Sequence, residues 1–215
     1  MKKDLINQLC QDLNPVLPAQ KPLVTSLIWI LLSGLLLGGF VSLFHRYRDD
    51  LFLVTHSLRF LWIFTTLILF SGFTAAQAFR SGIPGQENGR NATLFMLLLA
   101  ASFVIPVLYL LAEEPARLSM TGFDPRTGWH CSFSIVLYSL IPAFGLLWFL
   151  KKKLAATRPE FTGRMLGLAV GSLGAAILAW CCPINEGMHI LIWHLFPIFI
   201  LSLIFVRVAK KVLHF

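Results

Sequence analysis

Six long apolar stretches follow one another along the chain, each bounded by polar or turn-forming residues. A helix of about twenty apolar residues crosses the hydrocarbon core of a bilayer, and each stretch reaches that length without any Asp, Glu, Lys or Arg. The pattern predicts an all-α polytopic membrane protein with six transmembrane helices. The predicted spans are residues 22–44, 60–79, 93–112, 131–150, 165–184 and 188–206.

A short amphipathic pattern precedes the first span. Leu5, Leu9 and Leu13 recur every four residues with Ile6 beside them, and Pro15 ends the pattern. This spacing predicts a short helix with one apolar face. A helix of about ten residues is marginally stable alone, so we expect a partner for this face. The chain then divides into an N-terminal segment of residues 1–21, a bundle of residues 22–206 and a C-terminal tail of residues 207–215.

Two interpretations of this N-terminal helix remain open from its residues. It could lie on the inner membrane surface, or it could dock into a groove of a cytoplasmic protein. Asp4 and Asp12 make it unlike the basic helices that favour anionic lipid. Because the first twenty residues contain no apolar core of the signal-peptide kind, we expect them to be retained in the cytoplasm.

The composition changes the range of possible functions. Hydrophobic residues make up 57% of the 215 residues and charged residues 13%, about half the roughly 25% of a soluble domain. This excludes a soluble enzyme domain and a disulfide-stapled secreted domain. The net charge of +8 does not require direct binding of nucleic acid, because basic residues commonly flank membrane spans. Spans without ionisable Asp, Glu, Lys or Arg disfavour a pump or transporter.

The orientation follows from the distribution of Lys and Arg between the two membrane sides. With the N-terminus inside, 13 basic residues lie inside and five outside, so the positive-inside rule predicts that both termini are cytoplasmic. The inner set is Lys2, Lys3, Lys21, Arg80, Arg90, Lys151, Lys152, Lys153, Arg158, Arg164, Arg207, Lys210 and Lys211, and the outer set is Arg46, Arg48, Arg59, Arg117 and Arg126.

Cysteines and histidines gather at the predicted outer face. In this orientation the start of the fourth span, the end of the fifth and the start of the sixth share one membrane depth. They carry Cys131, Cys182, His189 and His194. Thiolate and imidazole bind zinc or copper, and two thiols facing an oxidising compartment can form a disulfide. The four residues are therefore candidate metal ligands, and the cysteines are candidate redox sensors.

An inert role for these residues is also open. The chain has no C-x-x-C motif, and Cys181 adjoins Cys182 as a second candidate thiol, with His130 as a further candidate ligand. Cysteines within spans often only pack. His189 and His194 are five residues apart, so on an ideal α-helix they would point in well-separated directions.

Glycines and prolines in the spans carry structural expectations. Gly167, Gly171 and Gly174 form a face of small residues in the fifth span, which predicts close approach of a neighbouring helix. We expect kinks at the prolines within spans, Pro106, Pro142 and Pro197.

Four features together resemble the NrsF family of bacterial membrane anti-sigma factors. They are Leu-Ile-x-x-Leu-x-x-Asp-Leu-x-Pro-Val from Leu5 to Val16, six spans, Gly-Trp-His-Cys ending at Cys131, and Cys182-Pro183 followed by Trp193-His194. The resemblance covers nearly the whole chain. It implies a multi-pass protein of the bacterial inner membrane that holds an extracytoplasmic-function (ECF) sigma factor inactive and releases it on oxidative or metal stress outside. It implies a regulator and not an enzyme.

The resemblance also implies roles for particular residues. Cys131 and Cys182 correspond to the two family cysteines. Where many relatives have His-Cys-Pro, this chain has Cys181-Cys182-Pro183, which leaves open which thiol responds. The sigma-binding residues are implied to lie in the N-terminal motif: Leu5, Ile6, Leu9, Asp12, Leu13, Pro15 and Val16.

Two other function classes remain as alternatives to this hypothesis. A membrane thiol oxidoreductase that passes electrons to a quinone would need a second cysteine pair for relay, and no C-x-x-C is present. A transporter of small solutes or metal ions is the other, and the spans lack the acidic and basic residues that such proteins use.

Overall fold

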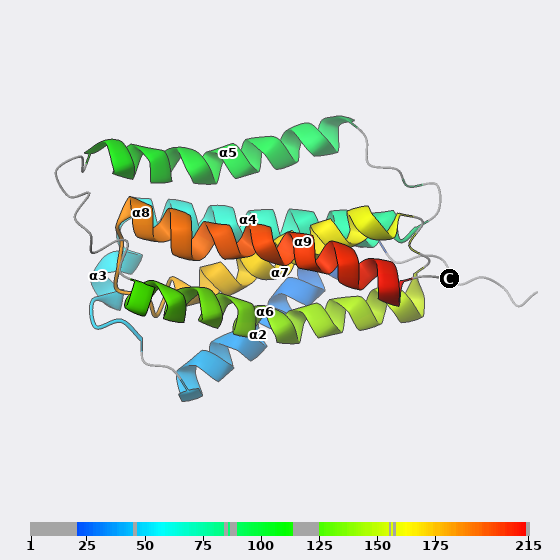
Figure 1. The fold of residues 1–215 in the computed structure, drawn as a ribbon, viewed down its shortest axis with the longest axis horizontal. Helices are drawn as coiled ribbons and strands as arrows, with labels where there is room; N and C mark the ends of the chain where they lie inside the picture. The colour runs from blue at the N-terminus through cyan, green and yellow to red at the C-terminus, as the bar shows by residue number, and fades with distance from the viewer. Residues whose placement is uncertain are drawn as a thin grey trace, which may run out of the picture.

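Antiparallel helices form a single bundle in the computed structural model of the chain, which describes residues 21–44, 47–83, 86, 90–113, 125–154, 156 and 158–213 (Figure 1). All regular secondary structure in these residues is helical, and six helices are long and apolar enough to cross a membrane. The prediction of an all-α fold with six apolar helices is confirmed. Successive long helices run in opposite directions. The first five are α2 (Pro22–Phe44), α4 (Leu58–Ser81), α5 (Arg90–Glu113), α6 (Pro125–Lys153) and α7 (Pro159–Leu178), and the short α3 (Leu51–Thr55) precedes α4. The last long helix is composed of α8 (Gly187–His189), η2 (Ile190–Leu195) and α9 (Phe196–Val212).

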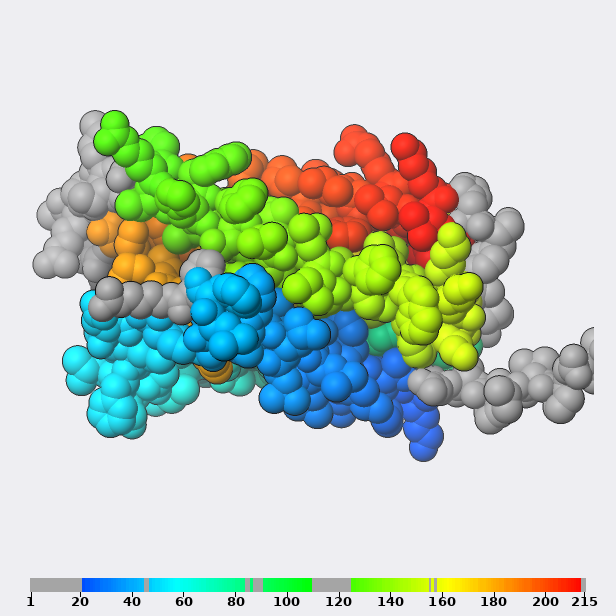
Figure 2. Space-filling view, turned by 90° about the horizontal axis from the view of Figure 1, so that it is seen from below, coloured from blue at the N-terminus to red at the C-terminus, as the bar shows by residue number. Residues whose placement is uncertain are grey.

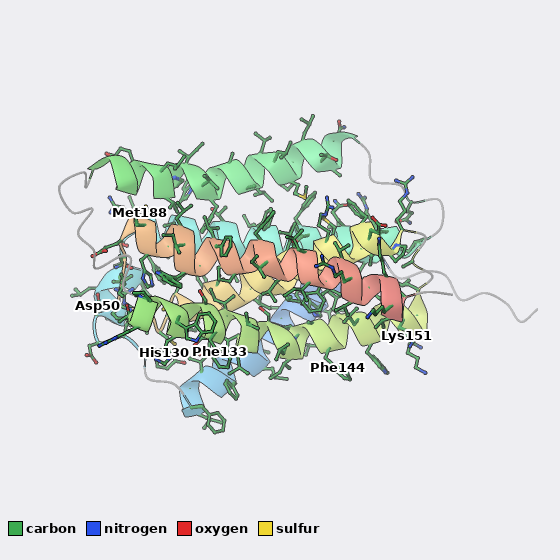
Figure 3. The ribbon with its side chains drawn as sticks, viewed as in Figure 1. Asp50, His130, Phe133, Phe144, Lys151 and Met188 are labelled. Atoms are coloured by element: carbon green, nitrogen blue, oxygen red, sulfur yellow. The ribbon has the colours of Figure 1, made fainter. Side chains whose placement is uncertain are left out.

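The two ends of the bundle differ in their side chains. Asp50, His130 and Met188 lie at the end that carries α3 and α8, which we call the α8 end (Figure 3). Lys151 lies at the opposite end, close to the place where α9 finishes. Phe133 and Phe144 are exposed on α6 by 57% and 74%, as expected for side chains that face lipid.

The fifth predicted span is displaced along the chain relative to α7. The prediction of residues 165–184 is wrong at both ends, because α7 covers Pro159–Leu178. Proline is favoured at the first position of a helix, so Pro159 starts α7 before the apolar run begins. Residues 180–184 belong to the turn and extended segment that follows. Cys181 and Cys182 therefore lie outside the helices, in the connection between α7 and α8.

The central helix of the bundle is α7, in which 15 of 20 residues are buried. Its glycines allow this burial, since a Cβ atom at Gly167 would lie 2.5 Å from the Cα of Ser202 in α9. A Cβ atom at Gly174 would lie 2.9 Å from the backbone oxygen of Ile135 in α6. The prediction that this glycine face permits close helix approach is confirmed.

Substitution of Gly167 by alanine is expected to lower the free energy of unfolding by about 1 to 3 kcal/mol, because the added methyl group must push α7 and α9 apart. Thermal unfolding of the protein in detergent would measure the change. Gly145→Ala in α6 is the matched control, since its Cβ would meet nothing within 4 Å and alanine favours the helix by roughly 1 kcal/mol. Equal melting temperatures for both variants would contradict the close packing.

Candidate functional site

Four candidate ligand residues meet at the α8 end of the bundle, and we call them the Cys–His cluster. Cys131 comes from α6, Cys182 from the connection after α7, His189 from α8 and His194 from η2. One ligand atom of each lies within 4.8 Å of those of the others. These are the four residues that the sequence placed at one membrane depth. His130, the reserve candidate, is exposed on α6 and is not part of this group.

The distances within the Cys–His cluster suit a four-coordinate metal ion. The sulfurs of Cys131 and Cys182 are 3.6 Å apart, and Cys182 Sγ is 3.4 Å from His189 Nε2. In a tetrahedral zinc site with Zn–S bonds of about 2.3 Å and Zn–N bonds of about 2.0 Å, two sulfurs lie about 3.8 Å apart, and a sulfur and a nitrogen about 3.5 Å apart. Little rearrangement would be needed to hold zinc or a similar soft ion.

The two histidines of the cluster are buried and incompletely hydrogen-bonded. His189 is 0% exposed and His194 is 6% exposed. No partner is found for His189 Nδ1 or His194 Nε2 among the described residues. Buried polar atoms are nearly always paired, so two such nitrogens beside two sulfurs distinguish this cluster from ordinary core packing.

A π-helical turn brings the two histidines together. The expectation that His189 and His194 point well apart is wrong, because their rings lie 5.3 Å apart between centroids. Five residues of an α-helix would separate the two directions by about 140°. The wider η2 turn carries the second ring back toward the first, as π-turns often do at functional sites. Pro197, four residues after Trp193, has no N–H to donate to the Trp193 carbonyl. That carbonyl accepts a hydrogen bond from Ser132 Oγ at 3.0 Å.

The neighbouring thiols Cys181 and Cys182 have different surroundings. Cys182 is 4% exposed and faces Cys131. The Cys131 thiol beside it, and then the two histidines, hold the pKa of Cys182 below its ordinary value despite burial. Burial raises the pKa of Cys181 to about 11. The thiolate is the reactive and metal-binding form, so this geometry favours Cys182 over Cys181 as the reacting group.

A cavity of about 330 Å³ reaches the Cys–His cluster from the side of α3 and α4. Its walls are mostly apolar, and Cys182 and His194 form part of them. A small molecule in this cavity would therefore contact Cys182 without unfolding of the bundle. The remaining lining residues are Leu53, Val54, Ser57, Arg59, Phe60, Ile63, Leu67, Phe103, Ala175, Ala179, Ile184, Asn185 and Ile190.

The sequence of this chain matches one protein family over most of its length. The sequence model of a family described as "Negative regulator of sigma F", NrsF, matches residues 9–215. The chain belongs to the NrsF family. No curated protein and no solved structure matches it. It is therefore a membrane-spanning anti-sigma factor, and its partner is a sigma factor.

The predicted sigma-binding residues of this NrsF-family chain lie outside the described residues. The family match begins at residue 9, so it includes Leu9 and the four motif residues that follow it but not Leu5 and Ile6. The described part of the chain begins at Lys21, immediately before α2. The role of the motif stays a prediction from the sequence.

Arg48 is a residue of this NrsF-family chain whose place beside the cluster the sequence did not predict. Its side chain is 1% exposed and forms an ion pair with Asp50 at 2.6 Å. It also donates hydrogen bonds to the backbone oxygens of Cys182 and Pro183 and to Asn185 Oδ1. In the sequence Arg48 is one of several basic residues between two spans, and only the tertiary structure brings it to the cysteine segment.

Proposed function

We propose that the chain is an inner-membrane anti-sigma factor that holds an ECF sigma factor at the cytoplasmic face through residues 1–21. In this proposal the Cys–His cluster at the outer face senses an oxidant or a metal ion, and its reaction releases the sigma factor. The observation that carries the proposal is the meeting of four soft ligand atoms within 4.8 Å in a family of negative regulators of sigma F. Inert packing would give no reason for two thiols and two unsatisfied imidazoles to converge.

The position of the cluster within the bundle supports a signal that crosses the membrane. The cluster lies at the α8 end (Figure 3), whereas the first, dark-blue part of α2 lies toward the opposite end, beside the yellow-green end of α6 (Figure 2). Since basic residues concentrate at the cytoplasmic side of membrane proteins, that opposite end is the expected cytoplasmic end. The N-terminal segment would then emerge where a sigma factor is available.

Oxidation of the two cysteines is one reaction that the cluster supports. Two thiols and one molecule of hydrogen peroxide give a disulfide and two molecules of water. The O–O bond breaks, an S–S bond forms between Cys131 and Cys182, and the two thiol protons pass to the oxygens. Attack begins from the thiolate, for which Cys182 is the better candidate because its sulfur lies 3.4 Å from His189 Nε2, a nitrogen that can accept the thiol proton.

Metal binding is the second reaction that the same residues support. Cys131, Cys182, His189 and His194 would hold the ion, and bound zinc or copper would keep both sulfurs as thiolates. Because an ion and a disulfide compete for the same sulfurs, both signals converge on the relative position of α6 and the α7–α8 connection.

The proposed function can be tested on the full chain purified in detergent with the sigma factor that accompanies it from its own cells. Hydrogen peroxide should oxidise two thiols, counted with a maleimide reagent, and release the sigma factor. After the same treatment, the Cys182→Ser variant should retain the sigma factor. The matched neighbour variant Cys181→Ser should release the sigma factor as the wild type does. Retention by the oxidised wild type would contradict the proposal, and a bound quinone without a sigma factor would favour a thiol oxidoreductase.

A metal-binding prediction follows from the geometry of the cluster. The reduced protein is expected to bind about one equivalent of zinc, as four-ligand sites do, and His194→Ala should weaken binding strongly by removing one ligand. Substitution with Co²⁺ would report thiolate coordination through a sulfur-to-metal charge-transfer band. The exposed His130 provides the control variant His130→Ala, which should bind as the wild type does. Equal binding by the two alanine variants would contradict this ligand set.

The orientation can be tested with reporter fusions. An enzyme that is active only in the cytoplasm should be active when fused after Phe215, and one active only outside should be active when inserted near Gly122. The excess of basic residues on the N-terminal side is the physical reason. The reversed pattern would contradict both the orientation and an outer position of the Cys–His cluster.

A further inference from the structure

We propose that Arg48 couples the Cys–His cluster to α2, and through α2 to the N-terminal segment. This inference rests on the proposed function, for which it supplies the step between the two sides of the membrane. It starts from the segment of residues 180–185, which contains Cys182 and is held at several points by the chain just after α2. We call this segment the cysteine segment.

Arg48 uses all of its side-chain donors in this contact. Nε and Nη2 donate hydrogen bonds to the two carboxylate oxygens of Asp50, at 2.6 and 2.9 Å. Nη1 donates to Cys182 O at 2.8 Å and to Asn185 Oδ1 at 3.1 Å, and Nη2 also donates to Pro183 O at 3.3 Å. A guanidinium has five N–H donors in a fixed planar arrangement. The arginine therefore holds the cysteine segment in one geometry relative to Asp50.

Two further contacts join the end of α2 to the same segment. The backbone N–H of Arg48 donates to Trp180 O at 3.2 Å. The ring of Tyr47 lies 6.5 Å from the ring of Trp180, and its hydroxyl is hydrogen-bonded to Ser42 in the last turn of α2 at 2.6 Å. Arg48 thus belongs to a continuous connection from α2 to Cys182.

Movement of Cys182 would be transmitted through this connection. A buried charge is costly unless it stays paired and hydrogen-bonded, so a displacement of the cysteine segment favours movement of Arg48 with it. The sulfurs of Cys131 and Cys182 are 3.6 Å apart and must approach by about 1.5 Å to form a disulfide. The residue that moves is the one whose backbone oxygen Arg48 holds.

The packing of α2 allows it to respond. Only four of its 23 residues are buried, namely Ser26, Trp29, Leu37 and Val41, whereas α7 is mostly buried. Figure 2 shows α2 on the surface of the bundle, beside α6. A Cβ atom at Gly34, Gly38 or Gly39 would meet nothing within 4 Å, so part of the helix has no tight neighbour. Because α2 begins at Pro22, directly after the N-terminal segment of residues 1–21, its movement displaces the point at which that segment is attached.

The test compares oxidised and reduced protein in Arg48→Gln. The affinity of the full chain for its co-purifying sigma factor is measured in both states, together with the extent of disulfide formation by hydrogen peroxide. In the wild type we expect reduced protein to bind at least about tenfold more tightly, a typical size for coupling between two sites. In Arg48→Gln the disulfide should still form, but the two affinities should become equal. A purely local structural role would not separate these two measurements.

Control variants define what would overturn the coupling. Arg126→Gln, an exposed arginine in the first turn of α6 at the same end, should keep the wild-type ratio of affinities. Asp50→Asn should give a ratio between those of the wild type and Arg48→Gln, and it tests the proposal if Arg48→Gln does not reach the membrane. A wild-type ratio in either Arg48→Gln or Asp50→Asn, or failure of Arg48→Gln to form the disulfide, would contradict the coupling alone. Equal affinities in the wild type would contradict the proposed function itself.

Discussion

Replacement of Cys131 or Cys182 by serine is expected to abolish induction by oxidant, with the protein still in the membrane and still repressing. Serine cannot form a disulfide and is a poor ligand for zinc or copper. The two sulfurs are 3.6 Å apart, so loss of either one removes the same reaction. A reporter gene under control of the sigma factor would measure induction, and immunoblots of membranes would measure protein levels.

The double variant tests whether the two cysteines act as one unit. Residues of a single reacting pair are strongly non-additive, so Cys131→Ser with Cys182→Ser should be no worse than either change alone. Cys181→Ser is the matched control and should be induced normally, because its sulfur is not part of the Cys–His cluster. Independent, additive losses would contradict a paired mechanism. Full induction of the double variant would leave the cysteines with a packing role only.

The six helices could be predicted because bilayer thickness imposes a length on every apolar run. The bounds of α2 at Pro22 and Phe44 agree with the prediction. The bounds of α7 do not, since hydropathy cannot locate the start that Pro159 imposes on the helix. This difference matters for function, because it moves Cys182 out of a helix and into a segment that other residues can hold.

The cluster could be predicted only in part. Membrane depth alone brought the four ligand residues to one level, because alternating helices return to the same face. The convergence of His189 and His194 depends on the π-turn η2, which the apolar periodicity does not reveal. The contact of Arg48 with Cys182 O joins residues far apart in sequence, so a count of basic residues around the spans could not find it.

The substitution Leu9→Asp is expected to release the sigma factor and switch its genes on without stress. Leu5, Leu9 and Leu13 form the continuous apolar stripe of the N-terminal segment, and each buried leucine contributes roughly 1.5 to 3 kcal/mol. A carboxylate at the centre of the stripe would also have to be desolvated when the sigma factor binds, which weakens binding further. The loss should lower affinity by at least about tenfold, since 1.4 kcal/mol corresponds to that factor. Reporter expression without oxidant and co-purification of the sigma factor would measure it.

Gln11→Asp is the matched control for Leu9→Asp, because it adds the same charge on the polar face of the predicted helix and should leave repression intact. A variant that combines Leu9→Asp with Cys182→Ser then shows whether the N-terminal segment acts before or after the Cys–His cluster. If the N-terminal segment acts after the cluster, the combined variant should be fully active with or without oxidant, as Leu9→Asp is alone. Full repression by Leu9→Asp at normal membrane levels would show that the sigma factor binds elsewhere. Restored repression in the combined variant would show that the cysteine segment controls the partner by a route that bypasses Leu9.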